Sequence, residues 1–125
     1  MSRALLTVSA AAFTLVGLGY LAAPGAMLSV VGIPSSPTND FLMRTEGVAL
    51  LTGAALIWVA RDAAGTGLRF ALGALAFYFV IGSVVDLLAW SSGIVGSAAV
   101  PSAAIRIALG GLCLIAAARP VSSRG

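Results

Sequence analysis

The chain lacks the residues on which several common protein chemistries depend. Its 125 residues include no histidine and one cysteine. There are four acidic residues and seven basic ones, and all seven basic residues are arginine. Without histidine and with a single cysteine, the chain cannot supply a usual haem ligand pair or a cysteine/histidine zinc site. A nucleophilic serine would have only carboxylates to act as its base. We therefore predict no catalytic residues and no metal site, and the sequence indicates no particular cofactor.

Charge and polar surface are scarce throughout the chain. Charged residues make up 9% of it and hydrophobic residues 60%, with a mean hydropathy of +1.09. This leaves too little polar surface to coat a water-soluble globule. The net charge of +3 would suit nucleic acid, but the arginines are scattered singly, without the basic stripe that a phosphate backbone requires. We therefore exclude nucleic acid as a partner.

Four long apolar runs fill most of the chain. They extend over residues 4–22, 41–60, 68–90 and 98–118. Each is close to the roughly 20 residues that an α-helix needs to cross a hydrocarbon layer about 30 Å thick. The sequence therefore predicts an all-α fold, an integral membrane bundle of four transmembrane helices. No linker divides it, so we expect a single domain over residues 1–125. The short link 61–67 predicts that the second and third runs are antiparallel neighbours.

Turn and cap signals predict the boundaries of the remaining elements. Pro24 ends the first run, and residues 26–33 have the pattern of a short interfacial helix. Asn39 or Asp40 is suited to cap the second run. Pro101 is expected in the first turn of the fourth run, where its missing N–H has no cost.

The arginines predict the orientation of the chain in the membrane. They flank the first run, the 61–69 link and the end of the fourth run, at Arg3, Arg61, Arg69, Arg119 and Arg124. The two other links contribute only Asp40 and the borderline Arg44. Because positively charged segments stay in the cytoplasm, we expect both termini and the 61–69 link there, in the inner cell membrane.

The first run also has features of a secretory signal. Arg3 precedes it, and the small residues at 21–26 would suit a cleavage site. Its apolar stretch is longer than the usual core of such a signal. We therefore expect a first helix that is retained.

Charged residues inside the apolar runs gather near the predicted outer face. Glu46 lies in the second run, Asp86 near the end of the third and Arg106 shortly after the start of the fourth, with Arg44 slightly shallower. At 1.5 Å per residue, they lie roughly 6–9 Å below the boundary. Their charges sum to zero, and one such residue at a helix centre costs about 2.5–3.5 kcal/mol. We predict that Arg106 pairs with Asp86 or Glu46, whereas Arg44 and Glu46 point to different sides of their helix.

Two interpretations of this cluster remain open. In the first, the charges form an ion-pair network that fixes the register of the helices and carries no chemistry. In the second, they line a polar pocket open to the outer face, with Tyr78 at its floor, that holds a lipophilic molecule or passes ions. Charge balance and the nearness of the interface favour the first interpretation.

Two segments of the first half hold a pattern of glycine, proline and leucine with one arginine. They are GLGYLAAP at 17–24, followed by GIP at 32–34, and RTEGVALLTG at 44–53. This pattern resembles the small bacterial four-helix membrane proteins of the DoxX-like group. The resemblance implies a four-helix membrane bundle, sometimes associated with redox or respiratory partners, and it brings no catalytic residues with it.

Three hypotheses for the function follow. The first is a structural or accessory subunit that packs against a larger membrane complex or forms a homo-oligomer, given the small size and small-residue helix faces. The alternative is binding or transport of a lipophilic small molecule at an outer-leaflet pocket. That pocket would be formed by Arg44, Glu46, Tyr78, Asp86 and Arg106. The third is a membrane enzyme that uses Asp86 or Glu46 as acid or base. Membrane lipid is an expected partner in each case.

Overall fold

The computed structural model describes residues 1–119, which fold into five α-helices with no strand among them. The helices are α1 (Ser2–Ala22), α2 (Pro24–Val30), α3 (Pro37–Ala60), α4 (Gly65–Ser91) and α5 (Ala99–Ala118). The four long ones have the length and hydropathy needed to cross a membrane. The all-α prediction is confirmed, with four long apolar helices at the four predicted runs. Arg124, one of the orienting arginines, lies outside the described residues.

Prolines lie in the first turn of three helices. Pro24 is the first residue of α2, so this short helix begins two residues earlier than predicted and ends at Val30. Pro37 similarly opens α3, and the hydroxyl of Ser36 accepts a hydrogen bond from the Asn39 amide at 3.1 Å. Ser36 is therefore the N-cap, and the prediction of Asn39 or Asp40 in that role is wrong. Pro101 lies in the first turn of α5, as predicted.

The ends of α2 and α4 share one turn motif. Each is followed by a glycine with positive φ, 76° at Gly32 and 72° at Gly93. The amide after each glycine donates to the carbonyl five positions earlier, at 3.0 Å after Gly32 and 2.9 Å after Gly93. This is the Schellman arrangement, which satisfies carbonyls at the helix end and favours glycine because only glycine adopts such φ without strain.

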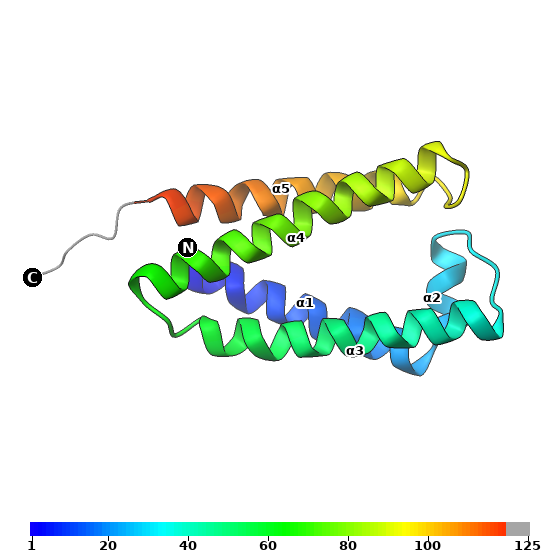
Figure 1. Cartoon of the computed structure of the whole chain (residues 1–125), viewed down its shortest axis with the longest axis horizontal. Helices are drawn as coiled ribbons and strands as arrows, with labels where there is room; N and C mark the ends of the chain where they lie inside the picture. The colour runs from blue at the N-terminus through cyan, green and yellow to red at the C-terminus, as the bar shows by residue number, and fades with distance from the viewer. Residues whose placement is uncertain (120–125) are drawn as a thin grey trace, which may run out of the picture.

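The long helices form two antiparallel pairs, α1 with α3 and α4 with α5 (Figure 1). Glycines allow the close approach within each pair. A Cβ atom on Gly47 of α3 would lie 2.9 Å from the carbonyl oxygen of Gly17 in α1, and one on Gly110 of α5 would lie 3.0 Å from Val80 in α4. The helices α3 and α4, which the short link predicted to be neighbours, have few contacts with each other. The pairs therefore join consecutive long helices through their glycine faces, and the shortness of the α3–α4 link does not make those two helices pack together.

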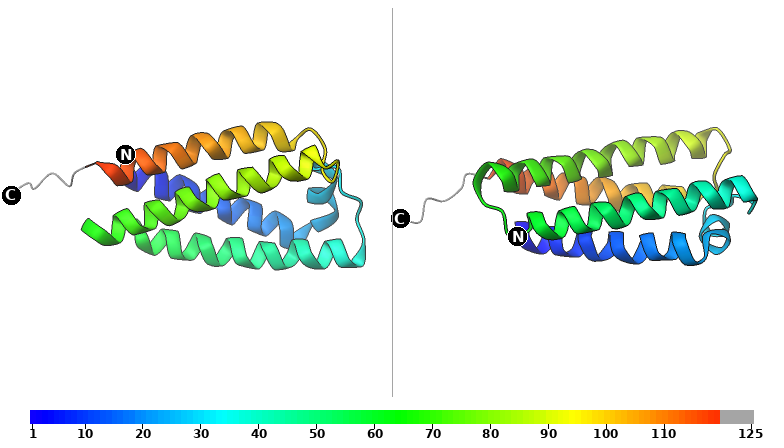
Figure 2. Two further views of the ribbon diagram at one scale, coloured as in Figure 1. Left: turned by 45° about the horizontal axis from the view of Figure 1, so that its top comes forward. Right: turned by 60° about the horizontal axis from the view of Figure 1, so that its bottom comes forward.

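The two ends of the molecule differ in content. At one end α1 begins, α3 connects to α4 and α5 finishes, and we call this the terminal end (Figure 2). At the other end, the loop end, lie α2 and the α4–α5 connection. The helix pairs diverge toward the loop end in the view of Figure 1. There the Gly96 amide donates to the Val31 carbonyl at 2.8 Å and joins the α4–α5 connection to the end of α2.

An aromatic group joins the helix pairs between the two ends. The ring of Phe13 in α1 lies 4.9 Å from that of Tyr78 and 6.0 Å from that of Phe79, both in α4. Leu6 and Leu72 are almost completely buried in the same core cluster. The space between the pairs is therefore filled by this core, which borders the cavity described next.

Candidate binding site between the helix pairs

A cavity of about 390 Å³ opens between the helix pairs, beside the aromatic group. All five helices contribute to it, and most of its wall is apolar, including Val16, Met27 and Leu50. Its polar residues include Tyr20 of α1, Glu46 of α3, Tyr78 of α4 and Arg106 of α5. We call these four residues the polar wall. A second cavity of about 460 Å³ shares all four of them, so the polar wall stands between two open spaces.

Arg106 and Asp86 form an ion pair at the polar wall. The distance between Arg106 Nη1 and Asp86 Oδ2 is 3.0 Å, and the two side chains are 29% and 31% exposed. Asp86 is one of the two partners predicted for Arg106, so that prediction is confirmed. The guanidinium carbon also lies 6.0 Å from the centre of the Tyr78 ring, at the limit of a cation–π contact. The pair joins α4 to α5 and holds the arginine charge beside a carboxylate.

Gly82 makes room for this ion pair. A Cβ atom at Gly82 would lie 3.0 Å from Arg106 Nη1, so the guanidinium passes over the helix where a side chain is missing. Gly82 precedes Asp86 by four residues, which places both on one face of α4. The glycine, which the sequence presents only as a small residue at helical spacing, gives the arginine its path to the aspartate.

Glu46 and Arg44 have different surroundings, as their two-residue separation predicts. Both side chains are exposed, but Glu46 lines both cavities, whereas Arg44 lines neither. The structure therefore does not bring Arg44 to the cluster in which the sequence placed it. Within residues 1–119, the Glu46 carboxylate is in no ion pair. The polar wall thus holds a carboxylate that no arginine of the described chain neutralises directly.

Tyr20 belongs to the site although sequence reasoning did not select it. It lines both cavities from α1, and the absent side chain of Gly47 accommodates it, since a Cβ there would lie 3.0 Å from Tyr20 Cβ. Tyr20 follows Phe13 and Val16 at helical spacing, and all three line the first cavity. That spacing was the available signal, because it marks the face of the first run that turns inward.

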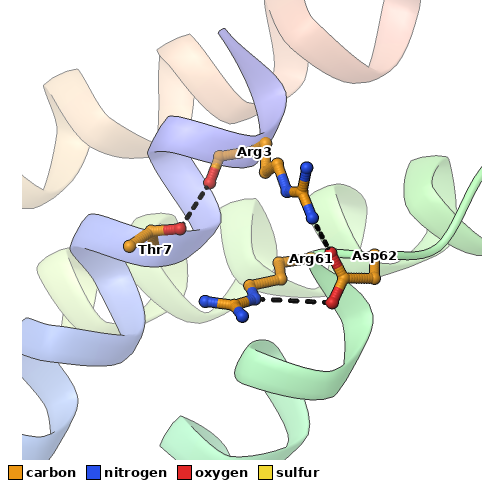
Figure 3. Close-up of polar contacts among 4 residues, drawn as sticks. All are labelled: Arg3, Thr7, Arg61 and Asp62. Atoms are coloured by element: carbon orange, nitrogen blue, oxygen red, sulfur yellow. Dashed lines mark hydrogen bonds and ion pairs between the residues drawn. The ribbon is translucent and has the colours of Figure 1, made fainter.

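A separate group of polar contacts lies at the terminal end. Arg3 of α1 forms an ion pair with Asp62 in the α3–α4 link, and the Arg61 Nε lies 3.5 Å from the same carboxylate (Figure 3). The hydrogen bond from Arg3 lowers the pKa of the Asp62 carboxyl below its ordinary value of 3.8, and the nearby arginine charges act in the same direction. On α4, Arg69 Nε donates to the Ala117 carbonyl at 2.9 Å and satisfies one of the last carbonyls of α5.

Neither comparison with known proteins nor a search for metal-ligating clusters assigns a function to this site. Among residues 1–119, no three metal-ligating side chains come together. No known protein family, curated protein or solved structure matches the chain. The resemblance to the DoxX-like group therefore stays a prediction, and the function is argued from the cavity and its lining.

Proposed function

We propose that this protein is a multi-pass protein of the inner membrane that binds an amphipathic small molecule between its two helix pairs. The observation that carries the proposal is the cavity of about 390 Å³ with a mostly apolar lining and the polar wall. A pocket of this kind, with a few convergent polar groups, is the usual form of a small-molecule site. The apolar lining accommodates a hydrocarbon part, and the polar wall accommodates a head group.

The proposed orientation follows from the position of the arginines. Arg3, Arg61, Arg69 and Arg119 all belong to segments at the terminal end. By the positive-inside bias, this end faces the cytoplasm and the loop end faces outward. The short helix α2 then lies at the outer interface, and the polar wall lies in the outer half of the bilayer, where lipophilic molecules enter from the outer leaflet.

Glu46 favours binding over a purely structural ion-pair network. A network with no other role would leave no charge unmatched, because an unpaired ionisable residue at a helix centre costs about 2.5–3.5 kcal/mol. Here the arginine at the polar wall is held by Asp86, and Glu46 faces the two cavities. An unpaired carboxylate inside a membrane bundle is by default a functional group.

The accessory-subunit hypothesis loses part of its basis. It relied on small-residue helix faces as docking surfaces, but Gly17, Gly47 and Gly110 pack α1 on α3 and α4 on α5 within the chain. Large apolar side chains such as Phe70 and Phe77, which are 80% and 68% exposed, suit lipid contact equally well. The enzyme hypothesis is also weakened for Asp86, because its carboxylate is already engaged by Arg106 in an ion pair.

Cavity filling tests the proposal. Ala12 lines the cavity, so Ala12→Phe places a ring at it, whereas the neighbouring Ala11, equally exposed, lines no part of it. After purification in mild detergent, native mass spectrometry should find a bound amphiphile on the wild type and on Ala11→Phe, and none on Ala12→Phe. Retention of the amphiphile by Ala12→Phe, or its absence from all three proteins, would contradict binding at this cavity. A stoichiometric protein partner in place of a small molecule would support the accessory-subunit hypothesis.

A further inference from the structure

The charges that line the two cavities do not balance. Glu46, Asp86 and Arg106 are the charged residues among the lining side chains, so one positive charge faces two negative charges and leaves one negative charge in excess. We expected from the sequence that the charges of the cluster sum to zero because the cluster included Arg44, but Arg44 lines neither cavity. The interior of the site is therefore acidic, although the chain as a whole has a net charge of +3.

The excess charge resides at Glu46. Arg106 lies 3.0 Å from Asp86, on its own helix pair, and the space over Gly82 holds its guanidinium there. Glu46 extends from α3, in the other helix pair, and lines both cavities from that side. Arg106 carries one positive charge, so it cannot balance both Asp86 and Glu46 even if it contacts both. A second positive charge, supplied from outside the chain, would balance the remaining carboxylate.

Aromatic rings beside Glu46 also favour a positive charge. Tyr20 and Tyr78 line the same two cavities, and the Phe13 ring packs on Tyr78 in a tilted arrangement with its centre 4.9 Å away. The faces of such rings attract cations, and the attraction strengthens where water is excluded. A carboxylate flanked by aromatic rings in an apolar pocket is the chemistry that recognises an organic ammonium group.

We infer that the molecule bound between the helix pairs is an amphipathic cation, a hydrophobic amine or quaternary ammonium compound, with Glu46 as its counter-ion. The inference rests on the proposed function and specifies its ligand class. A neutral head group would leave the Glu46 charge uncompensated in an apolar region, and an anionic one would be repelled by it. Tyr20 and Tyr78 pack on the cationic group, and the apolar lining holds the rest of the molecule.

Three probes of similar shape and different charge test the inference. They are tetraphenylphosphonium, the neutral triphenylphosphine oxide and tetraphenylborate, measured by equilibrium dialysis against the protein in zwitterionic lipid nanodiscs, with empty nanodiscs as background. We expect tetraphenylphosphonium to bind saturably and more tightly than either other probe. Glu46→Gln should weaken its binding about tenfold or more, since the lost interaction joins two opposite charges at the edge of a mostly apolar cavity, and should leave the neutral probe unaffected. Asp40→Asn removes the same charge from α3 outside both cavities and should leave both affinities unchanged.

The outcomes separate this inference from the proposed function. If the neutral probe binds as tightly as tetraphenylphosphonium, or tetraphenylborate binds most tightly, the cation inference is overturned while the cavity remains a binding site. Absence of saturable binding for every probe overturns the inference, and the proposed function fails only if native mass spectrometry also finds no amphiphile. Glu46→Asp keeps the charge and should keep the preference for the cation, so it decides the question if Glu46→Gln does not fold.

Discussion

At the terminal end, Arg3 and Asp62 are 72% and 55% exposed and meet outside the helical core, whereas toward the loop end Arg106 and Asp86 meet beside an apolar cavity. Both are arginine–aspartate pairs, but their surroundings differ. Water screens the exposed pair, so it contributes little to stability. The partly buried pair replaces lost hydration with a direct contact, and removing one partner leaves the other uncompensated. The same kind of pair therefore lies at the exposed surface at the terminal end and at the border of an interior cavity toward the loop end.

The space between the helix pairs is filled differently at the core cluster and at the cavity. Leu6 and Leu72 are almost completely buried in the core cluster and fill the space there. The cavity wall includes small side chains from two helix pairs, Ala12 of α1 and Ser102 of α5. Most of the remaining wall consists of larger side chains, so small residues alone do not account for the cavity. The cavity lies between the helix pairs, which diverge toward the loop end in the view of Figure 1.

The largest expected effect comes from breaking the Asp86–Arg106 pair while leaving the Arg3–Asp62 pair intact. Asp86→Asn should lower the free energy of unfolding by about 2–3 kcal/mol, less than the 3–5 kcal/mol of a fully buried pair because the side chains are partly exposed. Asp86→Asn combined with Arg106→Gln should recover most of the loss, because no charge is then left alone. Unfolding in mixed micelles measures these values. Asp62→Asn is the matched control, and an equal loss from it would remove the distinction between the two ends.

An intermediate effect is expected at Gly82. Gly73 lies on the same helix with nothing within 4 Å of an added Cβ, so Gly73→Ala should raise the free energy of unfolding by about 0.5–1 kcal/mol through helix propensity. The same change at Gly82 places its methyl group 3.0 Å from Arg106 Nη1 and displaces the guanidinium from Asp86. We expect the gain to be cancelled or reversed in the same unfolding measurement. If both variants were stabilised equally, Gly82 would have no part in holding the ion pair.

The sequence predicted the features that depend on the length of the apolar runs and on the depth of charged residues within them. Apolar runs of spanning length gave the four long helices, and equal depth in neighbouring runs gave the Asp86–Arg106 contact. Depth alone does not give the rotation of a helix about its axis. The spacing of Arg44 and Glu46 indicated that they diverge, but which of them faces inward depends on where Gly47 packs against α1.

Helix partners and caps were harder to predict from the sequence. The short link between α3 and α4 suggested close neighbours, yet the glycine faces pair α3 with α1. Ser36, Asn39 and Asp40 are all good N-caps, and Pro37 decides among them because its ring favours the first helical position. Tyr20 lies at helical spacing from other cavity residues of α1, but this spacing alone does not show that the shared face borders a cavity.

The smallest effect on stability is expected at the exposed Arg3–Asp62 pair, and this effect should depend on pH. The pKa of Asp62 is lowered, mainly by its hydrogen bond with Arg3, so the folded protein favours the ionised carboxylate. Its contribution to stability is therefore present above the ordinary value of 3.8 and is lost as the pH falls through the lower folded value. Thermal unfolding of the wild type and Asp62→Asn should differ slightly near neutral pH and converge in acid, and added salt should also reduce the difference. A difference that grew on acidification would mean that the carboxyl is bound in its protonated form, and the proposed contact with Arg3 would be wrong.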